Sequence, residues 1–142
     1  MKPLPEHGCC LVCGTVNPHS FGIQWFITKE GVITGKITLS DKQQGPPDFA
    51  HGGATAALVD EAMGAAIWQA GYTVVAVNLN VDYIKPVPLG QEIEVIGQIA
   101  EVGEGDKIVK ANGQIRLPDG NLAVTASGIY VNAPQLFGKF LG

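Results

Sequence analysis

Hydrophobic and polar positions divide this chain into strand-like segments on either side of one long helix-like segment. Residues 54–70 contain only two charged side chains, Asp60 and Glu61, contain no proline, and are rich in Ala, Leu and Met. Such a run favours an α-helix of about five turns that is apolar almost all round. We expect this helix to extend from His51 to Ala70, to end at Gly71, and to be covered on most of its faces.

β-branched and aromatic residues are enriched in segments before and after the predicted helix. The predicted strands are Phe21–Thr28, Val32–Leu39, Val77–Tyr83, Glu92–Val102, Lys107–Leu117 and Leu122–Val131. The third alternates apolar and polar residues, which is typical of a strand with one face in water. Turn sequences such as Pro118-Asp119-Gly120-Asn121 predict that consecutive strands are antiparallel.

The order of these elements predicts an α+β fold. We expect a single domain over residues 1–142, in which a curved antiparallel sheet of about six strands wraps around one central helix. A partner subunit would cover the face that remains open. Prolines and glycines predict a loop-like arm over residues 1–19, and residues 133–142 form a tail without a usable pattern.

Charge and composition narrow the classes of function. Nine Lys and Arg against 13 Asp and Glu give a net charge of −4, with Arg116 as the single arginine and no basic run, so we expect no nucleic-acid partner. No signal peptide is visible, which predicts a cytoplasmic protein. Two carboxylates in the middle of the helix argue against insertion into a membrane.

The three cysteines, Cys9, Cys10 and Cys13, lie close together near the N-terminus. An odd, local set is not a disulfide framework. With His7 and His19 these thiols could supply four ligands to zinc. The alternative, which we adopt, is that they are small thiols buried under the N-terminal segment, with no metal and no cofactor.

Asp60 and Glu61 are the first candidates for chemistry, because a carboxylate removed from water must be paired, hydrogen-bonded or used. Gly52 and Gly53 begin the helix, where free backbone N–H groups could form an oxyanion hole. The alternative is that these glycines only permit a tight turn. For Glu61 we favour a structural role, bonded to a neighbouring strand or loop.

Helix geometry separates these two groups. Asp60 lies eight residues after Gly52, roughly 12 Å along the helix axis at 1.5 Å per residue. A nucleophile and an oxyanion donor must both lie within about 3 to 3.5 Å of one carbonyl. One helix cannot meet this requirement, but two antiparallel copies across a two-fold axis can, so the spacing predicts a dimer.

Two further polar features have both a functional and a structural interpretation. His51 could act as a general base or could order the turn into the helix, and we favour the second role. The polar residues of the third predicted strand, Asn78, Asn80 and Asp82, are interpreted as a solvated face.

The segment His51-Gly52-Gly53 followed by Leu58-Val59-Asp60, with the later run Asn80–Gly90, resembles the hotdog-fold acyl-CoA thioesterases. The nearest type is similar to the phenylacetate-pathway and 4-hydroxybenzoyl-CoA thioesterase branch. The resemblance covers about residues 20–132. It implies a sheet wrapped around a central helix, assembled as homodimers or as dimers of dimers.

The resemblance also implies site residues. Asp60 matches the acid that acts as nucleophile or as base for water, Gly52 matches the residue whose N–H polarises the thioester carbonyl, and His51 and Gly53 complete the motif. Some relatives carry Asn or Gln in the loop before the histidine and Ser on the strand after the helix. Here the corresponding positions are Gly45 and Ala76, which we group with Glu61 and Lys85 as candidates for substrate binding.

We therefore expect hydrolysis of an acyl-CoA thioester, with the acyl group in an apolar tunnel beside the helix. Scattered cations are candidates for contact with the phosphates of coenzyme A, namely Lys85, Lys107, Lys110 and Arg116. Two alternatives remain. One is a hotdog enoyl-CoA hydratase or dehydratase, which normally needs a histidine with the acid, and the other is a non-catalytic acyl-CoA binding or sensing protein.

Overall fold

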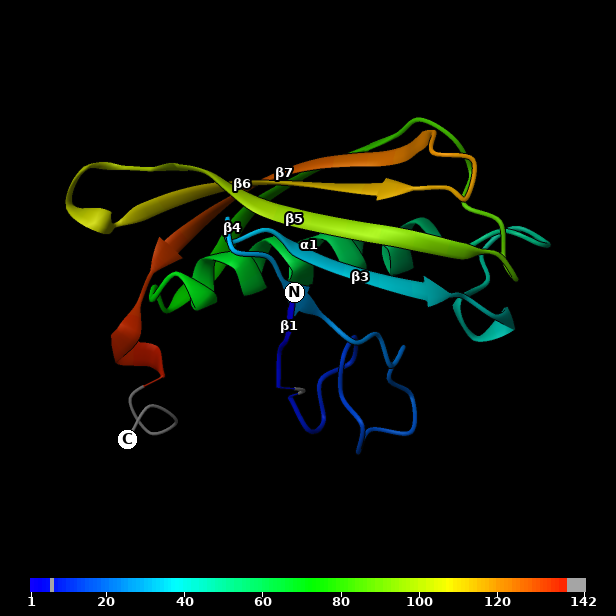
Figure 1. Ribbon diagram of the computed structural model, residues 1–142, viewed down its shortest axis with the longest axis horizontal. Coiled ribbons are helices and arrows are strands. Elements are labelled where there is room, and N and C mark those ends of the chain that lie inside the picture. The colour runs from blue at the N-terminus through cyan, green and yellow to red at the C-terminus, as the bar shows by residue number, and fades with distance from the viewer. Residues whose placement is uncertain (6, 138–142) are drawn as a thin grey trace.

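In the computed structural model, which describes residues 1–5 and 7–137, one α-helix lies against one face of a curved antiparallel sheet (Figure 1). The helix is α1 (Gly52–Gln69) and the strands are β1 (Lys2–Pro3), β2 (Phe26–Ile27), β3 (Ile33–Thr38), β4 (Val74–Tyr83), β5 (Glu92–Val102), β6 (Ile108–Arg116) and β7 (Leu122–Asn132). Their order in the sheet is β1-β2-β3-β5-β6-β7-β4. The predicted α+β fold is confirmed, with seven strands in place of about six.

Helix α1 begins and ends where the sequence predicts. The His51 side chain caps its first turn, and Gly71, with a φ of 101°, follows its last turn in the left-handed conformation that terminates many helices. The buried residues recur every three or four positions and form one stripe: Thr55, Leu58, Val59, Ala62, Met63, Ala66 and Ile67. This stripe faces the sheet, so the other side of the apolar helix stays available for other contacts.

A glycine in the centre of the sheet lets the helix approach it closely. A Cβ atom on Gly97 of β5 would lie 2.4 Å from the backbone carbon of Ala62, closer than real side chains allow. Gly113 of β6 lies beside Val59 and Met63 of the same helix. The small residues of the sheet therefore fix where α1 rests, and with it the positions of Asp60 and Glu61.

The predicted strand over Phe21–Thr28 is wrong in length, because only Phe26–Ile27 pair with β3. The backbone before them bonds to the N-terminal loop instead, since the Phe21 N–H donates to Leu11 O at 2.8 Å and the Gly22 N–H to Val12 O at 2.9 Å. The described residues among 1–19 form turns and loops apart from β1, which pairs with β2.

Strand β4 is one edge of the sheet and pairs only with β7 among the described strands. Asn78 and Asn80 line the outer surface with residues of β6 and β7, as expected for a solvated face. The apolar residues of β4 are also accessible in the single chain, because Val77 is 59% exposed and Leu79 is 38% exposed.

The C-terminal tail forms a short 3₁₀-helix, η3 (Pro134–Leu136), and residues 138–142 of the predicted tail lie outside the described residues. Two similar single turns, η1 (Asp41–Gln43) and η2 (Glu104–Asp106), lie in loops. Among the described helices, none combines the length and the hydropathy that crossing a membrane requires.

Candidate active site

Asp60 and Glu61 both line one cavity on the side of α1 that faces away from the sheet. This cavity has a volume of about 690 Å³ and is walled by α1, by the N-terminal segment (the described residues before β2, 1–5 and 7–25) and by the ends of β4 and β7. We call it the helix cavity. Most of its lining is apolar, including Ala57, Ala65 and Trp68. Its size and lining suit a medium-sized organic group with one reactive end near the carboxylates.

The Asp60 carboxylate is held by a tyrosine from the sheet. The hydroxyl of Tyr130 on β7 donates to Asp60 Oδ1 at 2.8 Å and lies 3.2 Å from the Asp60 carbonyl oxygen. Tyr130 is 3% exposed, and burial together with the negative charge of Asp60 raises the pKa of its phenol well above the usual range. Tyr130 therefore stays a hydrogen-bond donor to Asp60 at neutral pH.

Sequence reasoning missed Tyr130. The residue lies in a strand pattern in which an aromatic side chain is typical, so its type and position gave no signal. Tyr130 reaches the cavity that Asp60 lines because β7 pairs with β4, where Tyr130 lies opposite Ala76.

Glu61 has a different set of partners, all from the N-terminal segment. The indole N–H of Trp25 donates to Glu61 Oε2 at 2.6 Å, and the Cys10 thiol donates to Oε1 at 2.7 Å. This is the kind of structural role that the sequence favoured for Glu61. Ala76, the other predicted contact in this region, also lines the helix cavity.

The first two backbone N–H groups of α1 differ in their hydrogen bonding. His51 Nδ1 accepts from the Gly53 N–H at 2.8 Å, which matches the interpretation that this histidine orders the turn. The Gly52 N–H finds no acceptor among the described residues. An exposed amide at a helix N-terminus is a ready donor to a carbonyl oxygen or an anion.

Gly52 lines a second, smaller cavity of about 300 Å³, together with Tyr83 and Lys85. The Tyr83 hydroxyl donates to Gly52 O at 2.9 Å. Lys85 is thus the candidate cation that lines the cavity at the helix start. Gly45 lines neither this cavity nor the helix cavity, and a Cβ atom there would lie 2.8 Å from the Cα of His51.

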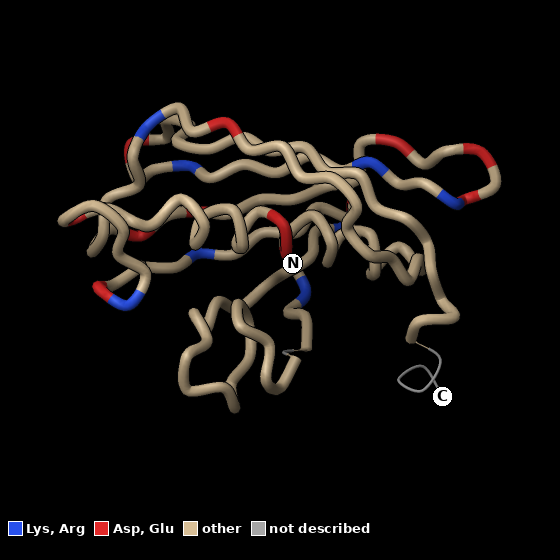
Figure 2. The backbone as a smooth tube through the Cα atoms, turned by 180° about the vertical axis from the view of Figure 1, so that it is seen from behind, with Lys and Arg blue, Asp and Glu red and all other residues tan. Residues whose placement is uncertain are grey.

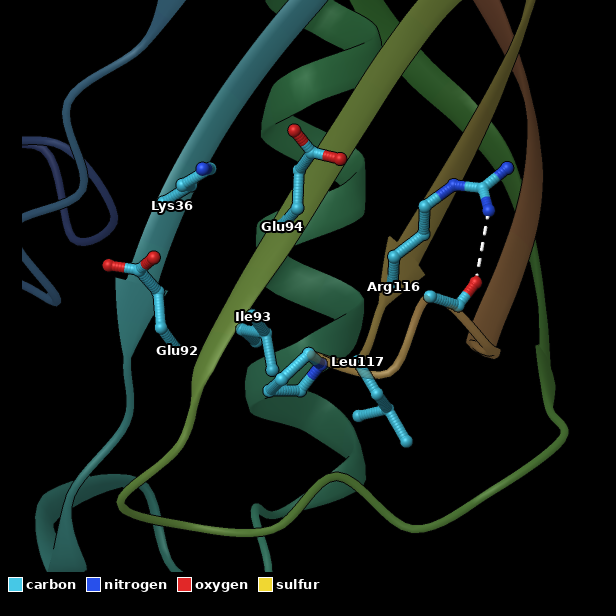
Figure 3. Close-up of a pocket in the computed structure, with 8 residues that line it drawn as sticks. Lys36, Glu92, Ile93, Glu94, Arg116 and Leu117 are labelled. Carbon is cyan, nitrogen blue, oxygen red and sulfur yellow. Dashed lines mark hydrogen bonds between the residues drawn. The ribbon is translucent and has the colours of Figure 1, made fainter.

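Two of the other candidate cations lie on the outer face of the sheet. Arg116 lies with Lys36 and Glu94 around a cavity of about 370 Å³, on the side of the sheet opposite the helix, and donates to Gly120 O at 3.1 Å (Figure 3). Lys110 pairs with Glu101 at 3.7 Å on the same outer face. Neither lines the helix cavity or the cavity of Gly52.

Known protein families include sequences similar to the part of this chain that spans α1 and β4 to β6. A family model described as the thioesterase superfamily matches residues 48–123. An acyl-coenzyme A thioesterase THEM4 of Xenopus laevis is 36% identical over 90 residues, which are 62% of this chain and 39% of that protein. THEM4 of Rattus norvegicus is 42% identical over 65 residues, 46% of this chain and 27% of that protein. The chain thus matches less than half the length of these curated relatives.

Solved structures share the fold. A crystal structure of a thioesterase superfamily protein superposes with a TM-score of 0.82 at 29% identity, over 86% of this chain and 62% of that chain. Smu.793 of Streptococcus mutans UA159, bound to acetyl CoA, superposes with a TM-score of 0.72 at 18% identity, over 78% of this chain and 88% of that chain. The second likeness shows a common fold alone.

Proposed function

Because this chain belongs to the thioesterase superfamily, we propose that it hydrolyses acyl-coenzyme A thioesters to a free acid and coenzyme A. The THEM4 relatives bear the name of that activity. The observation that carries the proposal is the Asp60 carboxylate, which Tyr130 holds at the wall of a largely apolar cavity. The resemblance assigns the reacting acid to this position.

The proposed site needs two copies of the chain. Asp60 and the free Gly52 amide are eight residues apart on one helix, roughly 12 Å along its axis, and they line different cavities. A reacting carbonyl must lie within about 3 to 3.5 Å of both groups. We propose that Asp60 of one copy works with Gly52 of the partner subunit, which gives two equivalent sites in a homodimer.

The edge strand β4 supports this homodimer. Its outer edge lacks a pairing strand among the described residues, and it exposes apolar side chains near α1, with Val77 at 59% and Tyr83 at 56%. An unpaired edge strand of ten residues that exposes apolar side chains is a template for pairing with another strand. Antiparallel pairing of β4 with its copy would continue the sheet and place the two helices side by side in opposite directions.

The chemistry follows from the groups in such a site. The thioester oxygen would accept the partner's Gly52 N–H, which stabilises the negative charge that develops on that oxygen. Asp60 would add to the carbonyl carbon itself, or would take a proton from a water molecule that adds instead. In either case collapse of the tetrahedral intermediate breaks the carbon–sulfur bond, and coenzyme A leaves as a thiolate. When water has added, this collapse yields the free acid directly. When Asp60 has added, the acyl group stays on Asp60 as a mixed anhydride, and a water molecule then hydrolyses that anhydride to the free acid and restores the Asp60 carboxylate.

The remaining parts of the substrate fit the two cavities. The acyl group would occupy the helix cavity, and a phosphate of coenzyme A would lie near Lys85, beside Gly52. Three free cysteines are compatible with a reducing compartment such as the cytoplasm, where we place the reaction.

Release of free thiol from a panel of straight-chain, branched and aromatic acyl-CoA esters tests the proposal. Asp60→Asn should lower kcat for the best ester by about 10²- to 10⁴-fold, the usual worth of a general base. Asp106→Asn is the matched control, because this exposed aspartate lines neither cavity and its φ of 57° suits asparagine. Unchanged turnover by Asp60→Asn would remove the mechanism. Binding of the esters without cleavage by the wild type would favour a sensing protein.

A further inference from the structure

Four side chains with metal-ligating atoms meet beside the helix cavity. His7, Cys10 and Cys13 come from the N-terminal segment and Glu61 comes from α1, and their ligating atoms all lie within 4.8 Å of one another. We call these four residues the His7 cluster. Cys9 and His19, which the sequence also suggested as ligands, are exposed and do not belong to it.

The distances in the His7 cluster are close to those of a tetrahedral zinc site. Zinc–ligand bonds of about 2.0 to 2.3 Å place tetrahedral ligand atoms about 3.3 to 3.8 Å apart. Cys13 Sγ lies 3.3 Å from His7 Nδ1 and Cys10 Sγ lies 2.7 Å from Glu61 Oε1. Shifts of about 1 Å in side-chain position would therefore accommodate an ion at the centre.

The loop that carries the two cysteines is a tight turn in which both thiols point the same way. Cys10 and Cys13 are separated by two residues, a spacing found in structural zinc sites. Gly14 N–H donates to Cys10 O at 3.0 Å and Val12 N–H to Cys10 Sγ at 3.4 Å. A Cβ atom on Gly14 would lie 2.4 Å from Gly8 O, so only glycine fits after Cys13.

Among the described residues, no Lys or Arg forms an ion pair with Glu61. Residues 7–28 contain no Lys or Arg, and Figure 2 shows the N-terminal loops without coloured charges beyond the first residues. Among the described residues, the salt bridge is between Lys110 and Glu101 on the outer face of the sheet. A partly buried carboxylate beside two thiols therefore lies where a cation would be favoured.

A hydrogen bond from Trp25 orients the carboxylate of Glu61. Trp25, which is 3% exposed, donates its indole N–H to Glu61 Oε2 at 2.6 Å and leaves Oε1 facing the cysteines. Ligands of metal ions are commonly held by such an outer hydrogen bond.

We propose that His7, Cys10, Cys13 and Glu61 bind one Zn²⁺ ion. Two thiolates, one imidazole and one carboxylate form a donor set that suits zinc. All four positions of a tetrahedral ion would be filled by protein, so the site is structural and offers no open position to substrate. This proposal replaces the expectation of buried thiols without a metal.

The ion would attach the N-terminal segment to the helix that carries Asp60. Leu4, Leu11 and Val12 of this segment line the helix cavity. Glu61 is the next residue after Asp60, so the ligand and the proposed reacting acid are covalent neighbours. Zinc binding would thereby hold in place the N-terminal wall of the cavity.

The first experiment uses the reduced wild-type chain. After incubation with ZnCl₂ and gel filtration, metal analysis should give about one zinc ion per chain. Substitution with Co²⁺ should give the visible bands of a tetrahedral ion together with thiolate-to-cobalt charge-transfer absorption. A chelator should lower Tm, and added zinc should restore it, because a ligand that binds the folded state stabilises that state.

Variants identify the ligands. Cys13→Ser and His7→Gln should lower the affinity for zinc by more than about tenfold. Cys9→Ser and His19→Gln are the matched controls, since both residues are exposed and lie in the same segment, and they should retain one ion per chain.

Three results would overturn the proposal, and none depends on the thioesterase reaction. The first is a wild-type chain that holds no stoichiometric zinc after incubation. The second is bound Co²⁺ without thiolate charge transfer. The third is loss of metal from Cys9→Ser as large as that from Cys13→Ser, which would place the ion elsewhere. If Cys13→Ser fails to fold, the wild-type Co²⁺ spectrum alone decides.

Discussion

Asp60 and Glu61 are adjacent in sequence, and their partners give them separate roles. Asp60 bonds to Tyr130 from the sheet, while Glu61 bonds to Trp25 and Cys10 from the N-terminal segment. Consecutive residues of a helix point about 100° apart, so the two carboxylates reach different neighbours although both line one cavity. We assign the reaction to Asp60 and the attachment of the N-terminal segment to Glu61.

Tyr130→Phe tests the positioning of Asp60. Loss of a hydrogen bond to a charged group, worth about 1.5 to 3 kcal/mol, should lower kcat about 10- to 100-fold with little change in KM. Steady-state thiol release measures both constants. Tyr72→Phe is the control, because Tyr72 lines neither cavity. A rise in KM with unchanged kcat would instead indicate a role in binding substrate.

The same tyrosine predicts a dependence of stability on alkaline pH. The pKa of Tyr130 is raised in the folded chain above its usual value near 10. Above about pH 10 the unfolded chain therefore loses this proton first, and the free energy of unfolding falls as the pH rises. Urea unfolding at pH 9 to 11 should show a shallower fall for Tyr130→Phe than for wild type. Equal slopes would mean that the folded phenol is not perturbed.

At the scale of elements, the start of α1 combines a cap with a free donor. His51 satisfies the Gly53 amide and leaves the Gly52 amide without an acceptor among the described residues. The His51 cap thus determines which backbone N–H at the start of α1 remains available to a substrate carbonyl.

Substitution of His51 distinguishes a cap from a general base. His51→Ala should lower the free energy of unfolding by about 1 kcal/mol, whereas His51→Asn should retain most of it because asparagine is a good helix cap. Chemical denaturation measures the difference. Thiol release by His51→Asn should stay within a few-fold of wild type on this account. A large loss of turnover in a stable His51→Asn variant would make the histidine catalytic.

The regular elements could be predicted from the sequence because each has a local signal. The apolar run ending at Gly71 marks α1, and the turn at Pro118–Asn121 marks the hairpin of β6 and β7. The path of residues 21–25 had no such signal, because their strand-like composition is overridden by hydrogen bonds to a loop ten residues earlier.

The candidate site could be predicted only in part, because only some of its residues are marked by a local sequence pattern. The carboxylates and the helix start are local features, so their sequence positions suffice. The meeting of Tyr130 with Asp60 and of Cys10 with Glu61 spans 70 and 51 residues. Such contacts depend on how the sheet and the N-terminal segment pack around the helix, which no local pattern records.

At the scale of the whole molecule, a single chain presents the parts of a site without assembling them. The helix cavity is lined by Asp60 and the smaller cavity by Gly52, and the unpaired edge strand β4 contributes residues to both. The central claim is that two copies complete each other's site.

Activity of a mixed dimer tests this claim most directly. Gly52→Pro removes the N–H, and proline is favoured at the first helical position after an extended residue such as His51, whose ψ is 137°. Gly52→Ala adds a similar side-chain atom near Tyr83 but keeps the N–H, which makes it the control. Gly52→Pro and Asp60→Asn homodimers should each be nearly inactive, and Gly52→Ala should stay active.

Co-expression of the Asp60→Asn and Gly52→Pro chains with different tags, followed by tandem purification, isolates the heterodimer. It contains one site with both groups intact, contributed by opposite chains, and one site with neither. The account predicts about half of the wild-type rate of thiol release from this heterodimer, because one of its two sites is complete. A heterodimer as inactive as its parents would contradict the account and place the whole site within one chain.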